Sequence, residues 1–255
     1  MTDIIIRPYK TEDIPALTRI WHGSFGDEIS MIEKFFELLP DMGKGFVAEK
    51  GGEVVGMLYM LDASFGERKV GYVYAVAVKP EYRRQGIGRS LCEAASSMDY
   101  DIIATLPAEN ELYTWYEKVL GTKPVLYGKH ERVYPGRGKT YYEINAAEYG
   151  EMREKLLVSK PHIEFSPSYL RYQEIICTTY GGGMFAGLGG IACGYIDDGM
   201  LHIKEALGDV SFLPALCADL GAQYAVIRTA DASGEPFIAA MGALPLECEW
   251  NLALD

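Results

Sequence analysis

Three arginines and two glycines lie close together in the first half of the chain, at Arg83, Arg84, Gly86, Gly88 and Arg89. Glycine lets a ligand approach the main chain because it has no Cβ to obstruct the contact. A helix that begins here leaves its first N–H groups unpaired, and its dipole favours an anion at that end. The arginines add positive charge. The segment therefore predicts a phosphate-binding loop built from main-chain N–H groups.

The residues before this loop predict a strand that positions it. Residues 73–78, Val-Tyr-Ala-Val-Ala-Val, are rich in β-branched and aromatic side chains, as is typical of a buried strand. Pro80 has no N–H to donate to a sheet, so we expect the strand to end by Lys79. The order is therefore strand, basic loop, glycines and helix.

Two other nucleotide-binding loops share this order of elements. A dinucleotide fingerprint needs a glycine three residues before Gly86, where this chain has Arg83. A Walker A loop needs Gly-Lys-Ser or Gly-Lys-Thr, which does not occur, so that loop is excluded. A purely structural turn remains open, but it does not explain three arginines beside two glycines.

A second segment that could do chemistry runs from Asn110 to Gly121, Asn-Glu-Leu-Tyr-Thr-Trp-Tyr-Glu-Lys-Val-Leu-Gly. It predicts a helix with Gly121 just past its end. The phenol of Tyr116 could donate a proton in a reaction. It could equally be a core aromatic with a satisfied hydroxyl, because this helix is rich in aromatic residues.

Together the two segments resemble the GNAT superfamily, the N-acetyltransferases that move an acetyl group from acetyl-CoA to an amine. The family's acetyl-CoA motif is Gln or Arg, two residues, Gly, one residue, then Gly or Ala, and Arg83, Gly86 and Gly88 fit it. A second family signature places aromatic-Tyr-Glu-Lys ahead of a glycine, and here Tyr116 takes the place of its tyrosine. The resemblance covers residues 4–134 and implies an α/β fold, a mixed sheet with helices on both faces.

The resemblance also implies a role for each matching residue. The Val76 N–H would stabilise the oxyanion on the acetyl carbonyl, the main chain of Val78 would hold the pantetheine arm, and Tyr116 would give a proton to the departing thiolate. Arg83 and Arg84 would lie near the pyrophosphate. The N–H groups expected to bind the pyrophosphate are those of Gln85, Gly86, Ile87, Gly88 and Arg89, and Asn110 completes the cofactor-binding set.

The general base stays open at this point. Some members of the family carry a glutamate on the fourth strand, but the matching positions here hold Tyr72, Val73 and Tyr74. Proton removal from the amine could pass through water. It could also use a group near the substrate side, for which the candidates are Asp62, Glu28 and His22.

The second half of the chain looks like a repeat of the first. Residues 46–56 align without gaps on residues 184–194, and both give a strand, a Gly-Gly turn and a second strand. Five further elements, before and after these residues, lie in the matching order, so duplication is the better interpretation. They are residues 141–157 for strand and helix, the helix 168–177, and the strands 200–207 and 224–228. The Pro-Gly-Arg-Gly-Lys loop at 135–139 predicts the boundary, with a GNAT domain over 1–138 and a second domain over 139–255.

The second copy departs from the family where the cofactor would bind. After Gly208 there is no Arg-x-x-Gly-x-Gly motif, and Asp209 would meet pyrophosphate with a repulsive charge. Phe237 or Ile238 falls near the position that Tyr116 has in the first copy. We therefore expect a degenerate GNAT-like domain that no longer binds acetyl-CoA and helps to form the substrate cleft.

Shorter signals predict the remaining elements of the first half. Residues 4–8 predict a strand, and Thr11 is expected to cap the helix that follows. A second helix is expected from Ile29 to Leu39, ended by Pro40. Two strands, 45–49 and 54–62, are expected to form a hairpin.

Composition limits the partners. The formal net charge of −12 argues against nucleic acid. The amino terminus, which begins at Met1, lacks a charged leader with an apolar core, and no apolar run is long enough to span a bilayer. We therefore expect a cytoplasmic protein without a membrane partner. The five cysteines are scattered, which predicts reduced core thiols. With four histidines and no cluster with cysteine, no metal is expected.

These observations predict an acetyl-CoA-dependent N-acetyltransferase. Its acceptor would be a primary amine of a small molecule or peptide, which would attack acetyl-CoA directly. The chain would be a monomer or a homodimer. Two alternatives remain: an acyl-CoA sensor without turnover, and a chain whose second half is an interaction or dimerisation surface.

Overall fold

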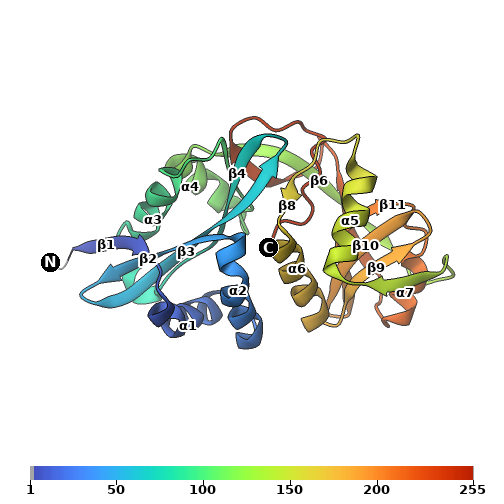
Figure 1. Cartoon of the computed structure of the whole chain (residues 1–255), viewed down its shortest axis with the longest axis horizontal. Helices are drawn as coiled ribbons and strands as arrows, with labels where there is room; N and C mark the ends of the chain where they lie inside the picture. Colours follow the sequence, from blue (N-terminus) through green and yellow to red (C-terminus); the bar gives the residue numbers. More distant parts are fainter. Residues whose placement is uncertain (1–2, 255) are drawn as a thin grey trace. The chain divides into compact units, whose positions relative to one another are not determined.

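The computed structural model describes residues 3–254, which form two compact units of α/β structure (Figure 1). The first unit comprises the chain up to Val125 together with Ile238–Leu244. The second unit comprises Leu126–Phe237 and Pro245–Leu254. Within residues 3–254, no helix is both long enough and apolar enough to cross a membrane.

This division differs from the expected boundary after residue 138, which lies inside the second unit. The reason is an exchange of strands. β6 (Lys123–Val133) pairs antiparallel with β12 (Ala225–Ala230) in the second unit. β13 (Glu235–Met241) pairs antiparallel with β5 (Ile102–Thr105) in the first unit. Each half of the sequence therefore contributes one strand to the sheet of the other half.

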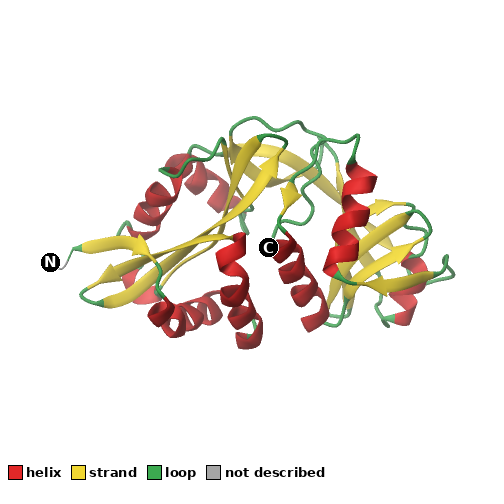
Figure 2. Ribbon diagram, in the orientation of Figure 1, coloured by secondary structure: helices red, strands yellow, loops and turns green. Residues whose placement is uncertain are grey.

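The sheet of the first unit has the order β1-β2-β3-β4-β5-β13. All neighbours are antiparallel except β4 and β5, which are parallel. Helices α1 and α2 cover one face and α3 and α4 the other (Figures 1 and 2). The strands not yet given are β1 (Ile4–Pro8), β2 (Gly43–Lys50), β3 (Glu53–Phe65) and β4 (Arg68–Val78). The helices are α1 (Ile14–Phe25), α2 (Ile29–Met42), α3 (Ile87–Ser96) and α4 (Asn110–Leu120).

Strand alternation sends neighbouring side chains of this sheet to two separate cores. Leu58 and Val73 pack with α3 and α4 in an aliphatic core. Their neighbours Tyr59 and Tyr74 contact Trp21 of α1, with ring centroids 5.3 and 5.5 Å from the indole. Both faces are buried, which is why the strand sequences are apolar at nearly every position.

Two predicted helix boundaries were wrong. Thr11 does not cap α1; it begins a short 3₁₀ turn (Thr11–Asp13), and α1 starts at Ile14. The N–H of Lys10 is satisfied instead by the Asp13 carboxylate, at 2.7 Å. Pro40 does not end α2, which continues to Met42. A proline in the last turn removes only one helical N–H, so the final residues can still follow.

The second unit repeats the element order of the first, which confirms the duplicated fold. Its sheet has the order β6-β12-β11-β10-β9-β7, with β11 and β12 parallel. α7 packs on one face, and Tyr149 of α5 hydrogen-bonds to Glu205 of β11. The strands are β7 (Tyr141–Ile144), β8 (Glu164–Phe165), β9 (Gly183–Gly187), β10 (Gly190–Asp197) and β11 (Met200–Gly208). The helices are α5 (Ala146–Leu157), α6 (Pro167–Thr179) and α7 (Leu213–Asp219).

The second copy has no counterpart of α4 among the described residues. A short turn joins β12 to β13, and Phe237 and Ile238 both lie in β13. They therefore do not occupy the position that Tyr116 has on its helix.

An ion-pair cluster ties the start of the chain to the edge of the first sheet. Arg7 on β1 donates to both carboxylate oxygens of Asp13, at 2.7 and 2.9 Å, and to Glu49 on β2, at 2.9 Å. Asp13 is buried, and its hydrogen bonds from Arg7 lower the pKa of its carboxyl. A bidentate pair of this kind is stronger than an exposed one.

We predict that Asp13→Asn lowers the free energy of unfolding by about 2 kcal/mol at pH 7, because it leaves the partly buried Arg7 without its main partner. A carboxyl with a lowered pKa stabilises the fold above its ordinary pKa and loses that effect as the pH falls through the folded-state value. The difference between parent and variant in urea unfolding should therefore shrink below about pH 4. Glu12→Gln, which neutralises an exposed neighbour, is the control, and equal effects of the two variants would contradict the prediction.

Candidate active site

The site begins where the pairing of β4 with β5 ends. Their parallel register runs from Val70 opposite Ile102 to Val73 opposite Thr105, the last residue of β5. β4 itself continues to Val78. Beyond Val73 no strand among residues 3–254 pairs with β4 on this side, which leaves an edge that a ligand main chain could join.

A β-bulge in β4 lies directly after this point. On β3, Tyr59 opposes Tyr74 and Met57 opposes Ala77, so β4 carries one extra residue. Ala75 has φ +48°, a conformation that residues other than glycine rarely adopt. Strained backbone of this kind is found at functional sites.

The bulge sets the direction of the main chain that follows. The Lys79 N–H donates to the Val55 carbonyl at 2.9 Å. By the alternation of an antiparallel ladder, Val78 then directs its N–H and C=O groups away from β3, toward the side where the pairing with β5 has ended. The Val78 carbonyl already accepts a hydrogen bond from Arg83 Nε at 3.0 Å, on that side.

The glycine loop enters α3 through left-handed backbone. Gly86 precedes the helix with φ +84°, and Arg84 has φ +59°. A Cβ on Gly86 would meet no atom within 4 Å, so the space in front of this glycine is open. The first N–H groups of α3 have no partner within the helix and face that end. The loop therefore has the form of an anion-binding site.

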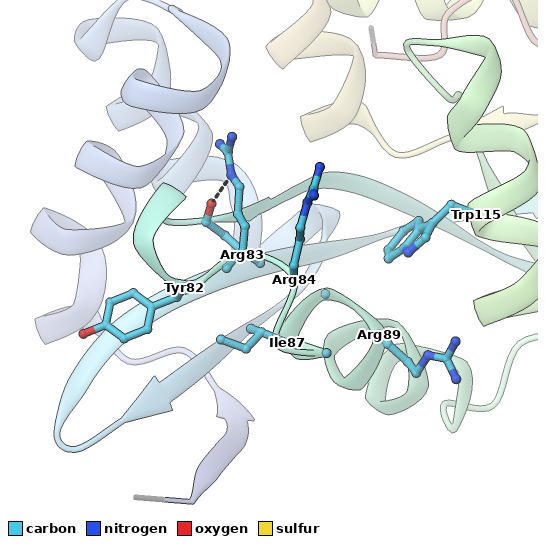
Figure 3. Close-up of a pocket in the computed structure, with 9 residues that line it drawn as sticks. Tyr82, Arg83, Arg84, Ile87, Arg89 and Trp115 are labelled. Carbon is cyan, nitrogen blue, oxygen red and sulfur yellow. Dashed lines mark hydrogen bonds between the residues drawn. The ribbon is translucent and has the colours of Figure 1, made fainter. Parts of the chain in front are cut away.

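A pocket of about 290 Å³ lies over this loop (Figure 3). The Arg83 and Arg84 side chains extend from the loop, and Trp115 lies across from them on α4. Arg84 and Arg89 form no ion pair with any residue between 3 and 254. In a chain with net charge −12, arginines without a carboxylate partner can bind an anionic ligand. The pocket is lined by Val78, Tyr82, Arg83, Arg84, Gly86, Ile87, Gly88, Arg89 and Trp115.

Seven of the predicted site residues line this pocket, and four do not. Val76 lies in the β4 bulge, and Tyr116 lies deeper in the unit. The Gln85 side chain turns outward and accepts a hydrogen bond from Lys50 at 2.7 Å, which leaves its main chain as the part that can face a ligand. Asn110 is the exposed first residue of α4.

Tyr116 lies in the buried core between the first sheet and helices α3 and α4. It is 8% exposed, and burial, then the nearby Cys92, raise the pKa of its phenol. A hydrogen bond with the Thr105 hydroxyl acts in the opposite direction. That hydroxyl also donates to the Val73 carbonyl at 3.2 Å, at the last paired position of β4. The phenol therefore keeps its proton at neutral pH, as a proton donor must.

Two residues of the pocket, Tyr82 and Trp115, were not predicted from the sequence. The Tyr82 hydroxyl donates to Glu53 at 2.8 Å, which places its ring beside the loop. Trp115 contacts Tyr116 with ring centroids 4.8 Å apart, and a Cβ on Gly88 would lie 3.4 Å from the indole. The aromatic residue before Tyr116 was a signal, but only the packing of α4 on α3 shows that it faces the pocket.

The three candidate bases do not line the pocket. His22 Nδ1 lies 2.8 Å from the Asp27 carbonyl, and Glu28 precedes α2. Asp62 accepts a hydrogen bond from the Tyr100 hydroxyl at 2.5 Å. The geometry favours none of them. Among residues 3–254, no group of three or more His, Cys, Asp or Glu side chains is placed to hold a metal ion.

The second unit keeps the strand geometry but not the anion site. The β11–β12 register ends at Ile203 and Ile227, and β11 is bulged near Lys204. Asp209 stands where the first unit has its arginines, and it pairs with Lys139. The same part of the chain crosses the start of α7, where the Gly136 N–H donates to the Pro214 carbonyl and the Lys139 N–H to the Ser211 carbonyl, at 3.0 and 3.2 Å. The second copy is therefore degenerate.

Comparison with known proteins agrees with this geometry. Residues 11–100 match the family described as Acetyltransferase (GNAT) family. An uncharacterized N-acetyltransferase of Chlorobaculum tepidum is 29% identical over 96 residues, which are 38% of this chain and 60% of the relative. The chain thus matches less than two thirds of that protein.

Solved structures with the same fold span nearly the whole chain. A putative acetyltransferase from Pyrococcus horikoshii superposes with a TM-score of 0.66 at 17% identity, over 98% of this chain and 92% of its own. A tandem GNAT protein from the clavulanic acid biosynthesis pathway superposes with a TM-score of 0.57 at 13% identity, over 95% and 99%. Residues 11–100 thus match the GNAT acetyltransferase family, and nearly the whole chain shares the fold of these solved structures, one of which is a tandem GNAT protein.

Proposed function

We propose that the protein transfers an acetyl group from acetyl-CoA to a primary amine of a small molecule or peptide. The observation that carries this proposal is the open anion-binding loop before α3, beside the free end of β4 in the first unit. The open main-chain loop with Arg84 and Arg89 shares its pocket with Val78, Val76 lies in the adjoining bulge, and both valines pack against the core that contains Tyr116. A diphosphate, an extended amide chain and a thioester would meet these groups in that order.

These residues would act in one direct displacement. The neutral amine attacks the thioester carbonyl, and the C–N bond forms as charge develops on the carbonyl oxygen. The Val76 N–H, which lies in the bulge, would donate to that oxygen. The C–S bond then breaks, the thiolate leaves, and Tyr116 supplies the proton that the sulfur takes up. The amine loses its own proton to water or to a base that remains unassigned.

Burial of Tyr116 keeps the phenol protonated, but it also makes loss of the phenol proton less favourable. The raised pKa keeps the phenol protonated, so a hydrogen bond can form to the sulfur as negative charge develops. Because a thiol is ordinarily a stronger acid than a phenol, complete transfer of the proton is uphill. The phenol therefore contributes first through the hydrogen bond, and its proton moves only as CoA departs.

We predict that Tyr116→Phe lowers kcat by about 100-fold, because general acid catalysis typically contributes at least that much. KM for acetyl-CoA should stay within about twofold, because the ring and its packing are kept. The measurement is release of free CoA thiol with a panel of small amines and amino-terminal peptides. Tyr9→Phe is the matched control, since Tyr9 is a half-buried tyrosine whose pKa is also raised by burial.

Unchanged turnover in the Phe variant would remove the acid role from Tyr116. If the parent binds acetyl-CoA but acetylates no amine in the panel, the sensor interpretation would replace the enzyme.

We also predict that Arg84→Gln and Arg89→Gln each weaken CoA binding by about tenfold, the size expected when one charge-assisted contact to phosphate is lost. Calorimetric titration with CoA measures this effect, and the loss should be smaller in 0.5 M salt because of screening. Arg19→Gln is the control, because Arg19 is an exposed arginine on α1 outside the pocket. If all three variants bind CoA with the same affinity, the pocket does not hold the phosphates of CoA.

A further inference from the structure

The Arg83 side chain covers part of the free edge of β4. Its Nε donates to the Val78 carbonyl at 3.0 Å (Figure 3). The Lys79 N–H donates to the Val55 carbonyl on β3, so the Val78 carbonyl points to the other side of β4, where no strand among residues 3–254 pairs with it. Arg83 therefore occupies an acceptor that a ligand lying along this edge as an added strand would use.

The main chain that carries Arg83 is held in place, whereas its side chain is exposed. The short 3₁₀ turn Pro80–Tyr82 follows β4 and ends at Arg83. Glu53 fixes this turn, because its carboxylate accepts hydrogen bonds from both Lys79 and Tyr82. The guanidinium lies at the surface, so it can turn away from the carbonyl without any change in the loop.

Arg83 has a second place to go, because it also lines the pocket in front of Gly86. An anion bound there would be the stronger partner. A phosphate carries its own negative charge and can take two parallel hydrogen bonds from one guanidinium. The Val78 carbonyl is neutral and takes only the single hydrogen bond from Nε. A phosphate in the pocket would therefore draw Arg83 away from β4.

This competition separates two kinds of thioester donor. CoA and pantetheine share the amide arm that would pair along β4, but only CoA carries the diphosphate. Pantetheine has nothing that moves Arg83, so its affinity is reduced by the fraction of molecules in which the carbonyl is covered. CoA exchanges the same hydrogen bond for stronger contacts at the loop.

We propose that Arg83 is a specificity-determining residue that selects donors carrying a diphosphate: it covers the Val78 carbonyl in the free protein and leaves it when a diphosphate binds before α3. Pantetheine thioesters that lack the nucleotide are then disfavoured, although they could pair with the same edge. This inference rests on the proposed function, because it takes acetyl-CoA as the donor and β4 as the strand that its pantetheine arm joins.

The test measures the affinities of parent and Arg83→Met for CoA and for pantetheine, by calorimetric titration with CoA and by competition of pantetheine against CoA. Methionine cannot donate a hydrogen bond, so the variant should bind pantetheine about three- to tenfold more tightly than the parent does, the size of one net hydrogen bond. Its affinity for CoA should not rise, because it also loses the contact with the diphosphate. The two ligands should therefore respond in different directions.

Arg84→Met is the matched variant. Arg84 lines the same pocket and carries the same charge, but it forms no hydrogen bond with the Val78 carbonyl. Arg84→Met should lose about tenfold in affinity for CoA without any gain for pantetheine. Arg19→Met, on α1 outside the pocket, should leave both affinities unchanged.

Two results would overturn the inference. If Arg83→Met binds pantetheine no more tightly than the parent, or shows no measurable displacement of CoA by pantetheine, the arginine does not compete for the carbonyl. If Arg84→Met gains as much affinity for pantetheine as Arg83→Met, the loss of positive charge explains the effect and the hydrogen bond to Val78 does not.

CoA binding by the parent separates this inference from the proposed function. If the parent binds CoA and Arg83→Met gains nothing for pantetheine, only the inference is wrong, and the anion site before α3 stands. If the parent does not bind CoA, the proposed function fails, and the inference fails with it.

Discussion

The end of the pairing between β4 and β5 is the constraint on which the rest of the site depends. Parallel pairing holds the strands together up to Val73 and Thr105, where β5 ends, and β4 continues through the bulge at Ala75 to Val78. A β4 that stayed paired along its whole length would leave no main-chain groups for a ligand. The position of the last pair therefore decides where the free edge of β4 begins.

Charge explains why the opening would take an anionic ligand. The chain is strongly acidic, and other basic side chains of the first unit pair with carboxylates, as Lys69 does with Asp99 and Lys79 with Glu53. Arg84 in the loop before α3 and Arg89 in the first turn of α3 form no such pair within residues 3–254. The second unit has lost this arrangement, since Asp209 and Lys139 neutralise each other over the corresponding helix. Duplication therefore kept the strand geometry in both halves and the anion site in one.

Local signals made much of the fold and of the site predictable. Pro80 ends a strand, Gly86 and Gly121 take left-handed conformations at helix ends, and each was visible in the sequence. The bulge at Ala75 was not, because alanine gives no sign of a positive φ and the register with β3 imposes it. The exchange of β6 and β13 pairs residues that are 92 to 138 positions apart in the sequence, which no local pattern encodes. Trp115 and Thr105 likewise gain their positions only through packing between elements.

The most direct test of the whole account is calorimetric titration of the protein with acetyl-CoA beside Gly86→Glu. The glutamate would place a carboxylate in the open space before α3. Gly66→Glu is the matched control, because Gly66 also has a positive φ and open surroundings but lies at the tip of the β3–β4 hairpin. The account predicts micromolar binding by the parent and the Gly66 variant and none by the Gly86 variant. Equal binding by all three, or no binding by the parent, would contradict it.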